Sequence, residues 1–364
     1  MKKLLGLLAL TASVSNLALA ETSGQDTLKK IYFSTEFRHT ATDQSRAKSN
    51  ELGLAGFRKA NTVGTKWRNI VGGDLNLSDE GNLGLRFNFQ NDQDTKKKYN
   101  SATKKNENSD RTQTWENDIA LYKDITIGSL DTRWDLGWLY KSSHGAGNYR
   151  YKGHLGTSNE IYFGPTFTFN VFNLPIKTKT QVVYFDQSGD KKADNAWEGK
   201  EFTRGKVSGW GFNLDLANEG TIFDNRAGNL GYYVELKHHF RDAKGKLAAS
   251  DKDAGSSVYL DYVTGLTYNT PSFAGFYGLI NAENEWEKHT AVHGYNNTFG
   301  VWTGLGYKKD FDLSVGTLNI NPVVKYKIVD KETEVKYNAV KESYKKTKEV
   351  NELRVGLNVA LDLK

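Results

Sequence analysis

The last segment of the chain alternates strictly between apolar residues and small, polar or charged ones. Leucine or valine stands at every odd position from Leu353 to Leu363, and the even positions hold Arg354, Gly356, Asn358, Ala360 and Asp362. Because successive side chains of a strand point to opposite faces, this pattern predicts a strand with one wholly aliphatic face. Such a strand suits a wall between lipid and water.

The same period of two recurs along most of the chain, for example at Leu83, Leu85, Phe87 and Phe89. We predict fourteen strands, at residues 31–38, 66–77, 83–90, 114–123, 130–140, 160–170, 176–185, 205–216, 230–240, 257–268, 276–286, 298–307, 317–328 and 351–363. Residues 51–63 are assigned to the first outer loop, because an odd number of spans would separate the two chain ends. Strand boundaries predicted from one sequence shift by several residues, so twelve or sixteen strands are the alternatives.

A membrane-spanning helix is not expected, because the chain after its first residues has no run of about 18 apolar residues. A barrel strand shows lipid only every second side chain, so averaged hydropathy does not reveal it. The 35 glycines, 4 prolines and 12% aromatic residues also favour strands over helices. We therefore predict an all-β fold, a transmembrane antiparallel β-barrel.

The connections between predicted strands alternate between short and long, as in barrels with short periplasmic turns and long outer loops. Short turns are predicted at residues 78–82, 124–129, 171–175 and 269–275, and long hydrophilic loops at residues 91–111, 142–157, 186–202, 242–255 and 329–350. Residues 330–350 are expected as a solvated loop because they are dense in charge. A short helix or an extended hairpin is the alternative there.

The first residues have the pattern of a secretory signal peptide. Two lysines precede an apolar run from Leu4 to Leu10, and the small residues Ala18 and Ala20 stand before Glu21. The run is too short for a membrane anchor. We predict cleavage between Ala20 and Glu21, which leaves residues 21–364 as the barrel and directs it to a bacterial outer membrane of the Gram-negative type.

If the apolar set of each strand faces lipid, the charged set faces the barrel interior. The resulting candidates for lining a pore are Arg86, Arg133, Asp135, Lys177, Lys179, Glu235, Lys237, Asp261, Glu283, Glu285, Lys325, Lys327 and Arg354. Burying so many charges without water would be prohibitive, so the interior is expected to be wet. A barrel of about fourteen strands is also closer in size to those that leave an aqueous channel than to those filled by side chains.

Two lysine pairs repeat with a spacing of two residues. Lys177 and Lys179 share one predicted strand, and Lys325 and Lys327 share another. Each pair could form a basic ladder that favours anions in the pore. The simpler interpretation is that acidic residues of the interior, such as Glu235, balance them.

Aromatic residues gather near predicted strand ends, which is typical of the girdles at the two membrane interfaces of a barrel. They are Trp115, Tyr122, Trp138, Tyr140, Tyr184, Trp210, Tyr268, Trp286 and Tyr307. The alternative, packing in a soluble core, would require that core to absorb the charges of the opposite face.

Motifs for catalysis or metal binding are scarce. His289 and His293 are four residues apart in a predicted outer loop without a His-Glu-x-x-His pattern, and His238 and His239 face opposite sides of one strand. There is no cysteine, no Gly-x-Ser-x-Gly and no phosphate-binding glycine-rich loop. We expect no enzymatic activity, cofactor or metal. The net charge of +6, with acids and bases mixed, also argues against a nucleic-acid partner.

The chain resembles the FomA-type major outer-membrane porins over its whole length. The resemblance is carried by MKKLL at residues 1–5, ETSG at 21–24, IYFSTEFR at 31–38 and LRVGLN at 353–358. It implies a voltage-gated, rather nonspecific diffusion porin that forms a homotrimer, with outer loops that are adhesive and antigenic. One departure from barrels in general is the C-terminus, which ends in Lys364 and not in the aromatic residue that many barrels present to their assembly machinery.

We expect a porin for passive diffusion of small polar solutes and ions, embedded among outer-membrane lipids. One alternative is a selective channel for acidic oligosaccharides of the oligogalacturonate type, for which Tyr233, Tyr259 and Trp302 lie on the inward set. Another is an adhesin whose barrel displays loops to ligands on host or bacterial surfaces.

Overall fold

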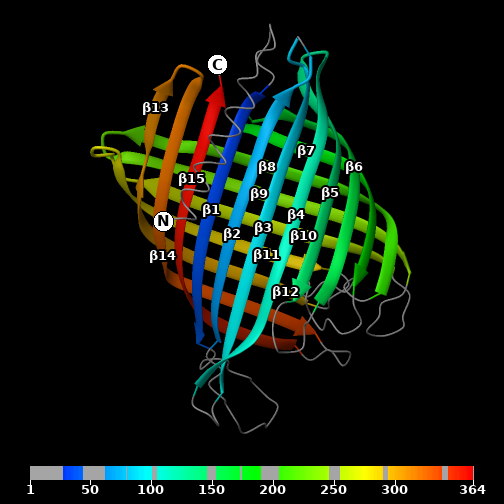
Figure 1. The fold of residues 1–364 in the computed structure, drawn as a ribbon, viewed down its shortest axis with the longest axis vertical. Helices are drawn as coiled ribbons and strands as arrows, with labels where there is room; N and C mark the ends of the chain where they lie inside the picture. The colour runs from blue at the N-terminus through cyan, green and yellow to red at the C-terminus, as the bar shows by residue number, and fades with distance from the viewer. Residues whose placement is uncertain are drawn as a thin grey trace.

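A single antiparallel sheet closes on itself to form a barrel (Figure 1). The computed structural model describes residues 28–43, 62–78, 80–100, 105–145, 153–172, 174–189, 205–245, 255–289, 294–337 and 343–363. Closure comes from pairing between β1 and β15, which runs from Lys30 opposite Asp362 to Asp43 opposite Glu349. The predicted all-β barrel is confirmed. The predicted signal peptide, its cleavage site, and residues 51–61 of the predicted first loop lie outside the described residues.

Each predicted strand matches one observed strand. The strands are β1 (Leu28–Asp43), β2 (Thr62–Asn76), β3 (Leu83–Asn100), β4 (Lys105–Ile127), β5 (Leu130–Gly145), β6 (Gly153–Val171), β7 (Leu174–Gly189), β8 (Gly205–Asn225), β9 (Gly228–Gly245), β10 (Ser256–Asn269), β11 (Phe276–His289), β12 (Gly294–Tyr307), β13 (Lys309–Leu313), β14 (Gly316–Tyr337) and β15 (Ser343–Leu363). The additional one is β13, which has no counterpart among the predicted strands.

The short β13 continues the line of β12 after a break at Lys308. β14 pairs first with β13, through Gly316 opposite Leu313, and then with β12, starting at Val323 opposite Gly306. The backbone N–H of Lys308 donates instead to the carbonyl oxygen of Gly275, at 2.9 Å. The ring around the barrel therefore has fourteen strands, as predicted, and not twelve or sixteen.

The short turns and the end of β15 lie at the same end of the barrel, the upper end in Figure 1. At this end β4 and β5 are joined through Gly128, which has a φ of 64°. That left-handed conformation is open to glycine at little cost, so the turn can be tight. The even strand number thus brings both ends of the barrel to the side of the short turns.

The predicted long loops are shorter than expected, because the strands extend into them. Residues 91–111 were predicted as a loop, but β3 runs to Asn100 and pairs with β4 down to Lys105. Strands also extend to Gly145, Gly189 and Gly245, past the predicted loop starts. The polar composition of these segments shows that they lie outside the membrane, but it does not prevent strand pairing. Hydrogen bonds between paired strands satisfy backbone N–H and C=O groups in water as well.

The preferred prediction of a solvated loop at residues 330–350 is wrong. β14 continues to Tyr337 and β15 begins at Ser343, so the described residues on either side of 338–342 are paired strands, as in the alternative of an extended hairpin. The backbones of the two strands pair here, as at Glu334 opposite Lys346, and such a ladder satisfies backbone N–H and C=O groups in a charged segment as well as in an apolar one. His289 also differs from its prediction, because it is the last residue of β11 and does not lie in a loop. Its predicted neighbour His293 lies outside the described residues.

The outer surface of the barrel carries a broad apolar band. Leu136, Phe163, Val182 and Phe212 form a row on directly paired positions of β5 to β8, with 40–51% of each side chain exposed. So much exposed apolar surface in register across neighbouring strands is unfavourable in water and requires lipid. The chain is therefore a transmembrane barrel of the outer-membrane type. No helix in the described residues is long and apolar enough to cross a membrane.

Most predicted girdle aromatics lie on this outer surface, and one does not. Tyr184 and Trp210 contact each other with ring centroids 5.2 Å apart, and Trp138 stacks on Tyr140 at 5.7 Å. Tyr122 is instead only 1% exposed and points inward. Its place was wrongly predicted because it was grouped with Trp115, seven residues away and therefore on the opposite face of the strand.

Candidate functional site on the inner wall

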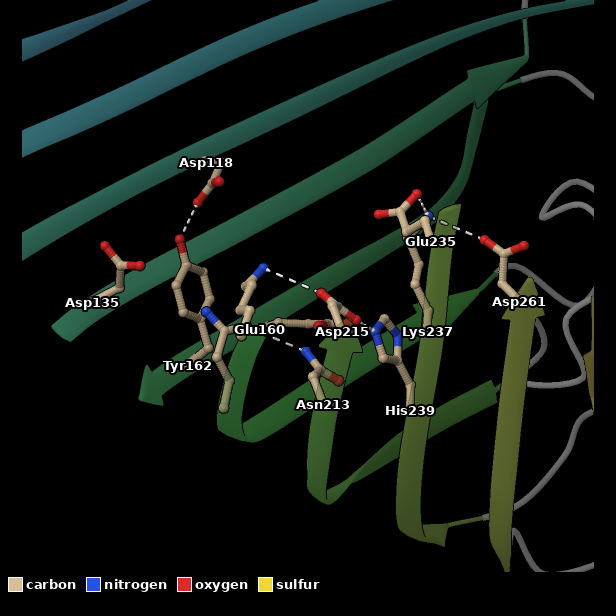
Figure 2. A network of polar contacts seen from close by, with 12 residues as sticks. Asp118, Asp135, Glu160, Tyr162, Asn213, Asp215, Glu235, Lys237, His239 and Asp261 are labelled. Carbon is tan, nitrogen blue, oxygen red and sulfur yellow. Dashed lines mark hydrogen bonds and ion pairs between the residues drawn. The ribbon is translucent and has the colours of Figure 1, made fainter. Parts of the chain in front are cut away.

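The inner wall of the barrel is the candidate site, and the predicted pore-lining residues all occupy the inward set of positions. They are Arg86 on β3, Arg133 and Asp135 on β5, Lys177 and Lys179 on β7, Glu235 and Lys237 on β9, Asp261 on β10, Glu283 and Glu285 on β11, Lys325 and Lys327 on β14, and Arg354 on β15. Figure 2 shows part of this set, with side chains from neighbouring strands meeting in one polar network.

Two ion-pair groups lie side by side in that network (Figure 2). Asp215 of β8 accepts from His239 at 2.7 Å and lies 3.8 Å from the ammonium of Lys179. One row along, Lys237 lies 3.1 Å from carboxylate oxygens of both Glu235 and Asp261. The predicted lumen charges of both signs are thus brought together on adjacent strands.

Arg241 links four strands of the same wall. Its guanidinium donates to Asn213 at 2.7 Å and reaches Glu160 of β6 at 3.3 Å. The guanidinium carbon of Arg241 also lies 5.8 Å from the ring centroid of Phe185 on β7. The sequence-based prediction omitted Arg241 and Glu160, although both follow the inward parity of their strands.

Five inward tyrosines repeat one arrangement, in which the ring lies across a glycine of the next strand. The pairs are Tyr32 with Gly72, Tyr122 with Gly84, Tyr162 with Gly137, Tyr233 with Gly265 and Tyr277 with Gly306, and a Cβ added to any of these glycines would fall 2.1–2.3 Å from the ring. Each hydroxyl donates to a side chain one strand further on, in order Asn88, Asp74, Asp118, Glu283 and Asn321. The tyrosines therefore lie flat along the wall and do not project across the interior.

On β3 to β5, the two predicted arginines each lie near an aspartate, but at different distances. Arg133 makes a bidentate contact with Asp124, at 2.7 and 3.0 Å, and its guanidinium lies 4.0 Å from the ring of Tyr122. Arg86 and Asp135 are 3.9 Å apart, and Asp135 is 2% exposed. A carboxylate so deeply placed needs a nearby cation, and Arg86 supplies it.

A cluster of carboxylates lies on β10 and β11. Asp261, Glu285 and Glu287 each bring one oxygen within 4.8 Å of the others. Hard divalent cations prefer such oxygen donors, so these are the residues through which this wall could hold a metal ion. Lys237 offsets part of their charge through Asp261.

Positively charged side chains gather on β14 and β15, around Trp302 of β12. Lys327, Arg354 and Lys325 lie 4.5, 5.3 and 5.6 Å from centroids of the indole ring. Trp302 is 3% exposed, so its face is not open to a passing sugar ring. The two lysines of one predicted ladder are thus brought together with a third cation, whereas Lys179 of the other ladder is partnered by Asp215.

Part of the inner wall is apolar, which the sequence-based prediction missed. Val183 and Phe185 share the inward face of β7 with the lysine pair and are 0 and 1% exposed. Phe185 packs with Val207 and Ala243, and Val183 packs with Ala120 and Tyr162. The alternation on β7 carries no sign of this, because Val182 and Tyr184 on the outward face are equally apolar.

No family model matches the sequence, and no curated protein matches it. Among solved structures, it is similar to a FadL homologue from Pseudomonas aeruginosa, with 9% identity, a TM-score of 0.42, and coverage of 93% of this chain and 91% of that one. OprB from Pseudomonas putida gives 10% identity, a TM-score of 0.37, and coverage of 89% and 92%. The translocator domain of the autotransporter NalP from Neisseria meningitidis gives 11% identity, a TM-score of 0.34, and coverage of 95% and 92%. At these values no family is assigned, and the chain is a fourteen-stranded barrel of the outer-membrane type with a charged inner wall.

Proposed function

We propose that this chain forms a water-filled, voltage-gated channel through which small hydrophilic solutes and ions cross the outer membrane by passive diffusion. The supporting observation is the direction of the inward polar contacts. Those described above join strands at most three apart in the ring, as Arg241 of β9 joins Glu160 of β6. Opposite walls of a fourteen-stranded ring are farther apart than that, so these contacts line the interior and do not bridge it.

Charge on the inner wall supports the same proposal. Lys177 is exposed, and among the described residues Lys325 has no ion-pair partner, so both charges would be very costly to keep on the wall without water. A barrel of about fourteen strands is wide enough to hold water beside such side chains. As the resemblance to FomA-type porins implies, we also propose a homotrimer in outer-membrane lipid. The scarcity of catalytic motifs and the mixed charge lead us to propose no enzymatic activity and no nucleic-acid partner.

Purified protein in planar lipid bilayers is expected to give large, ohmic conductance steps that close at high voltage. Liposomes that contain it should swell with neutral sugars at a rate that falls smoothly as sugar size rises. Heat-denatured protein in the same detergent is the control. Absence of steps would contradict the channel, and a sharp preference for acidic oligosaccharides would favour the selective alternative.

Charge reversal of Lys177 and Lys179 tests the basic ladder on β7. Lys179 lies near Asp215 and Lys177 is exposed, so the double change to glutamate is expected to move the reversal potential in a salt gradient toward cation preference. Reversal of Lys97, which lies outside the predicted spanning part of β3, should leave it unchanged. If the double variant behaves like the wild type, the lysines do not act as a ladder.

A second role, display of adhesive surfaces, is favoured by the length of the outer hairpins. A tilted spanning strand needs about 9–11 residues, whereas β4 has 23 and β14 has 22. The excess must extend beyond the membrane and would be available to surface ligands. Shortening the β14–β15 hairpin between Lys331 and Lys348 should lower attachment to host or bacterial cells while conductance is kept. If the shortened variant attaches to cells as well as the wild type, the hairpin does not support adhesion.

A further inference from the structure

A row of three cations crosses the inner wall from β1 to β14. Arg38 stands opposite Arg354, and Arg354 stands opposite Lys325. Like charges on directly opposite positions repel each other. Glu36 and Glu352 pair with the two arginines. Among the described residues, no carboxylate lies within ion-pair distance of the Lys325 ammonium, and Glu36 and Glu283 act on it only from farther away, so this cation of the row has no direct counter-charge.

Trp302 lies directly beside this row and has a free donor. Its Nε1 is buried and has no hydrogen-bond partner among the described residues. A buried N–H without an acceptor is costly, and three cations around the ring make the indole a stronger donor. The far edge of the ring packs against Gly300, where an added Cβ would lie 2.6 Å from Cη2. The indole can occupy this position only because Gly300 has no side chain.

The backbone is irregular at the same point. β14 shifts its register against β12 between Val301 and Trp302, and against β15 between Tyr326 and Glu332. Bulges of this kind occur frequently beside functional sites, where they redirect a side chain. Here Lys327 lies at the shift, 7% exposed, and donates to Asp330 at 2.7 Å.

We propose that Trp302, Lys325 and Arg354 form a binding site for a small anion, such as a carboxylate or phosphate group of a polar solute. The anion accepts a hydrogen bond from Nε1 of Trp302 and neutralises the ammonium of Lys325. A water molecule would satisfy the indole N–H but would leave Lys325 without a direct counter-charge, whereas an anion accepts from the N–H and also pairs with the ammonium. The side chain of Lys325 has a flexible four-carbon stem, so its ammonium can move to meet an anion that accepts from Nε1.

The indole N–H signals of the protein in detergent micelles test this site directly. The chain has 8 tryptophans, and the signal of Trp302 is identified by its loss in Trp302→Phe. Acetate at low ionic strength is expected to shift that signal saturably, and acetamide, which has the same shape without the charge, is not. Lys325→Gln should weaken acetate binding about tenfold, as expected for loss of a charge-assisted contact. Lys177 is an inward lysine on β7, on another part of the barrel wall. The Lys177→Gln variant should therefore bind acetate as the wild type does.

Equal effects of acetate and acetamide on the wild type would overturn the proposal, and this comparison requires no variant to fold. So would a Lys325→Gln protein that titrates like the wild type. A role of the site in transport rests on the proposed channel function, but binding in micelles does not depend on conduction. A barrel that conducts without binding acetate and one that binds acetate without conducting are therefore distinguished.

Discussion

Leu236→Arg is expected to destabilise the folded barrel by about 2–4 kcal/mol, which is the cost of an arginine on the lipid face near the membrane centre. Leu236 lies near the middle of β9, and its side chain is 37% exposed. Its direct neighbours Leu216 and Tyr262 continue the apolar band. Urea unfolding in lipid vesicles, followed by tryptophan fluorescence, measures the change.

The matched control is the adjacent residue on the same strand. Glu235 faces the interior, where Lys237 already lies 3.1 Å from it. Glu235→Arg places the same new side chain against water and should therefore change stability much less than Leu236→Arg. If both variants were equally unstable, the two faces of β9 would not differ in environment, and the assignment of lipid and water to them would be wrong.

Gly137→Ala is expected to destabilise the barrel by about 1–3 kcal/mol, the usual cost of forcing extra volume into a packed site. The new Cβ would lie 2.1 Å from Cζ of Tyr162, so the ring would have to swing away from the wall. That movement breaks the hydrogen bond from the Tyr162 hydroxyl to Asp118, which is 2.6 Å long. The shift in the unfolding midpoint, and in the temperature at which the folded band is lost on gels, reports the effect.

Gly356→Ala is the control, because its nearest neighbour, the carbonyl oxygen of Thr35, would lie 3.7 Å from the new Cβ. It should be as stable as the wild type or slightly more so, since alanine has less backbone freedom to lose. Combining Gly137→Ala with Tyr162→Ser should remove most of the cost of the alanine. A double variant as unstable as the sum of the two single ones would show that the ring and the glycine do not interact.

Strand number and strand face could be predicted from the sequence because both depend on a local period. On β9, Glu235 and Lys237 alternate with Val234 and Leu236, and that pattern alone assigns each residue to one face. The extent of the strands could not be predicted in the same way. β4 begins at Lys105 in a run of polar residues without apolar alternation, so only its pairing with β3 defines the strand there.

For the candidate site, too, the sequence predicted the face of each residue but not its contacts. The sequence identified Lys325 and Arg354 as inward, but their position opposite each other depends on the register between β14 and β15. Trp302 was identified as inward too, yet its buried, unpartnered N–H and the cations around its ring become visible only where β12, β14 and β15 are brought together. No spacing along one strand contains that information.

The sequence by itself determined that this chain builds a wall with an apolar face and a charged face, and how many times the chain crosses it, because alternation acts between neighbouring residues. Only the tertiary structure decided which charges meet. Register between strands is fixed by hydrogen bonds and turns that join residues far apart in the chain, so the tyrosine that covers Gly137 and the carboxylate that accepts from it come from strands on either side.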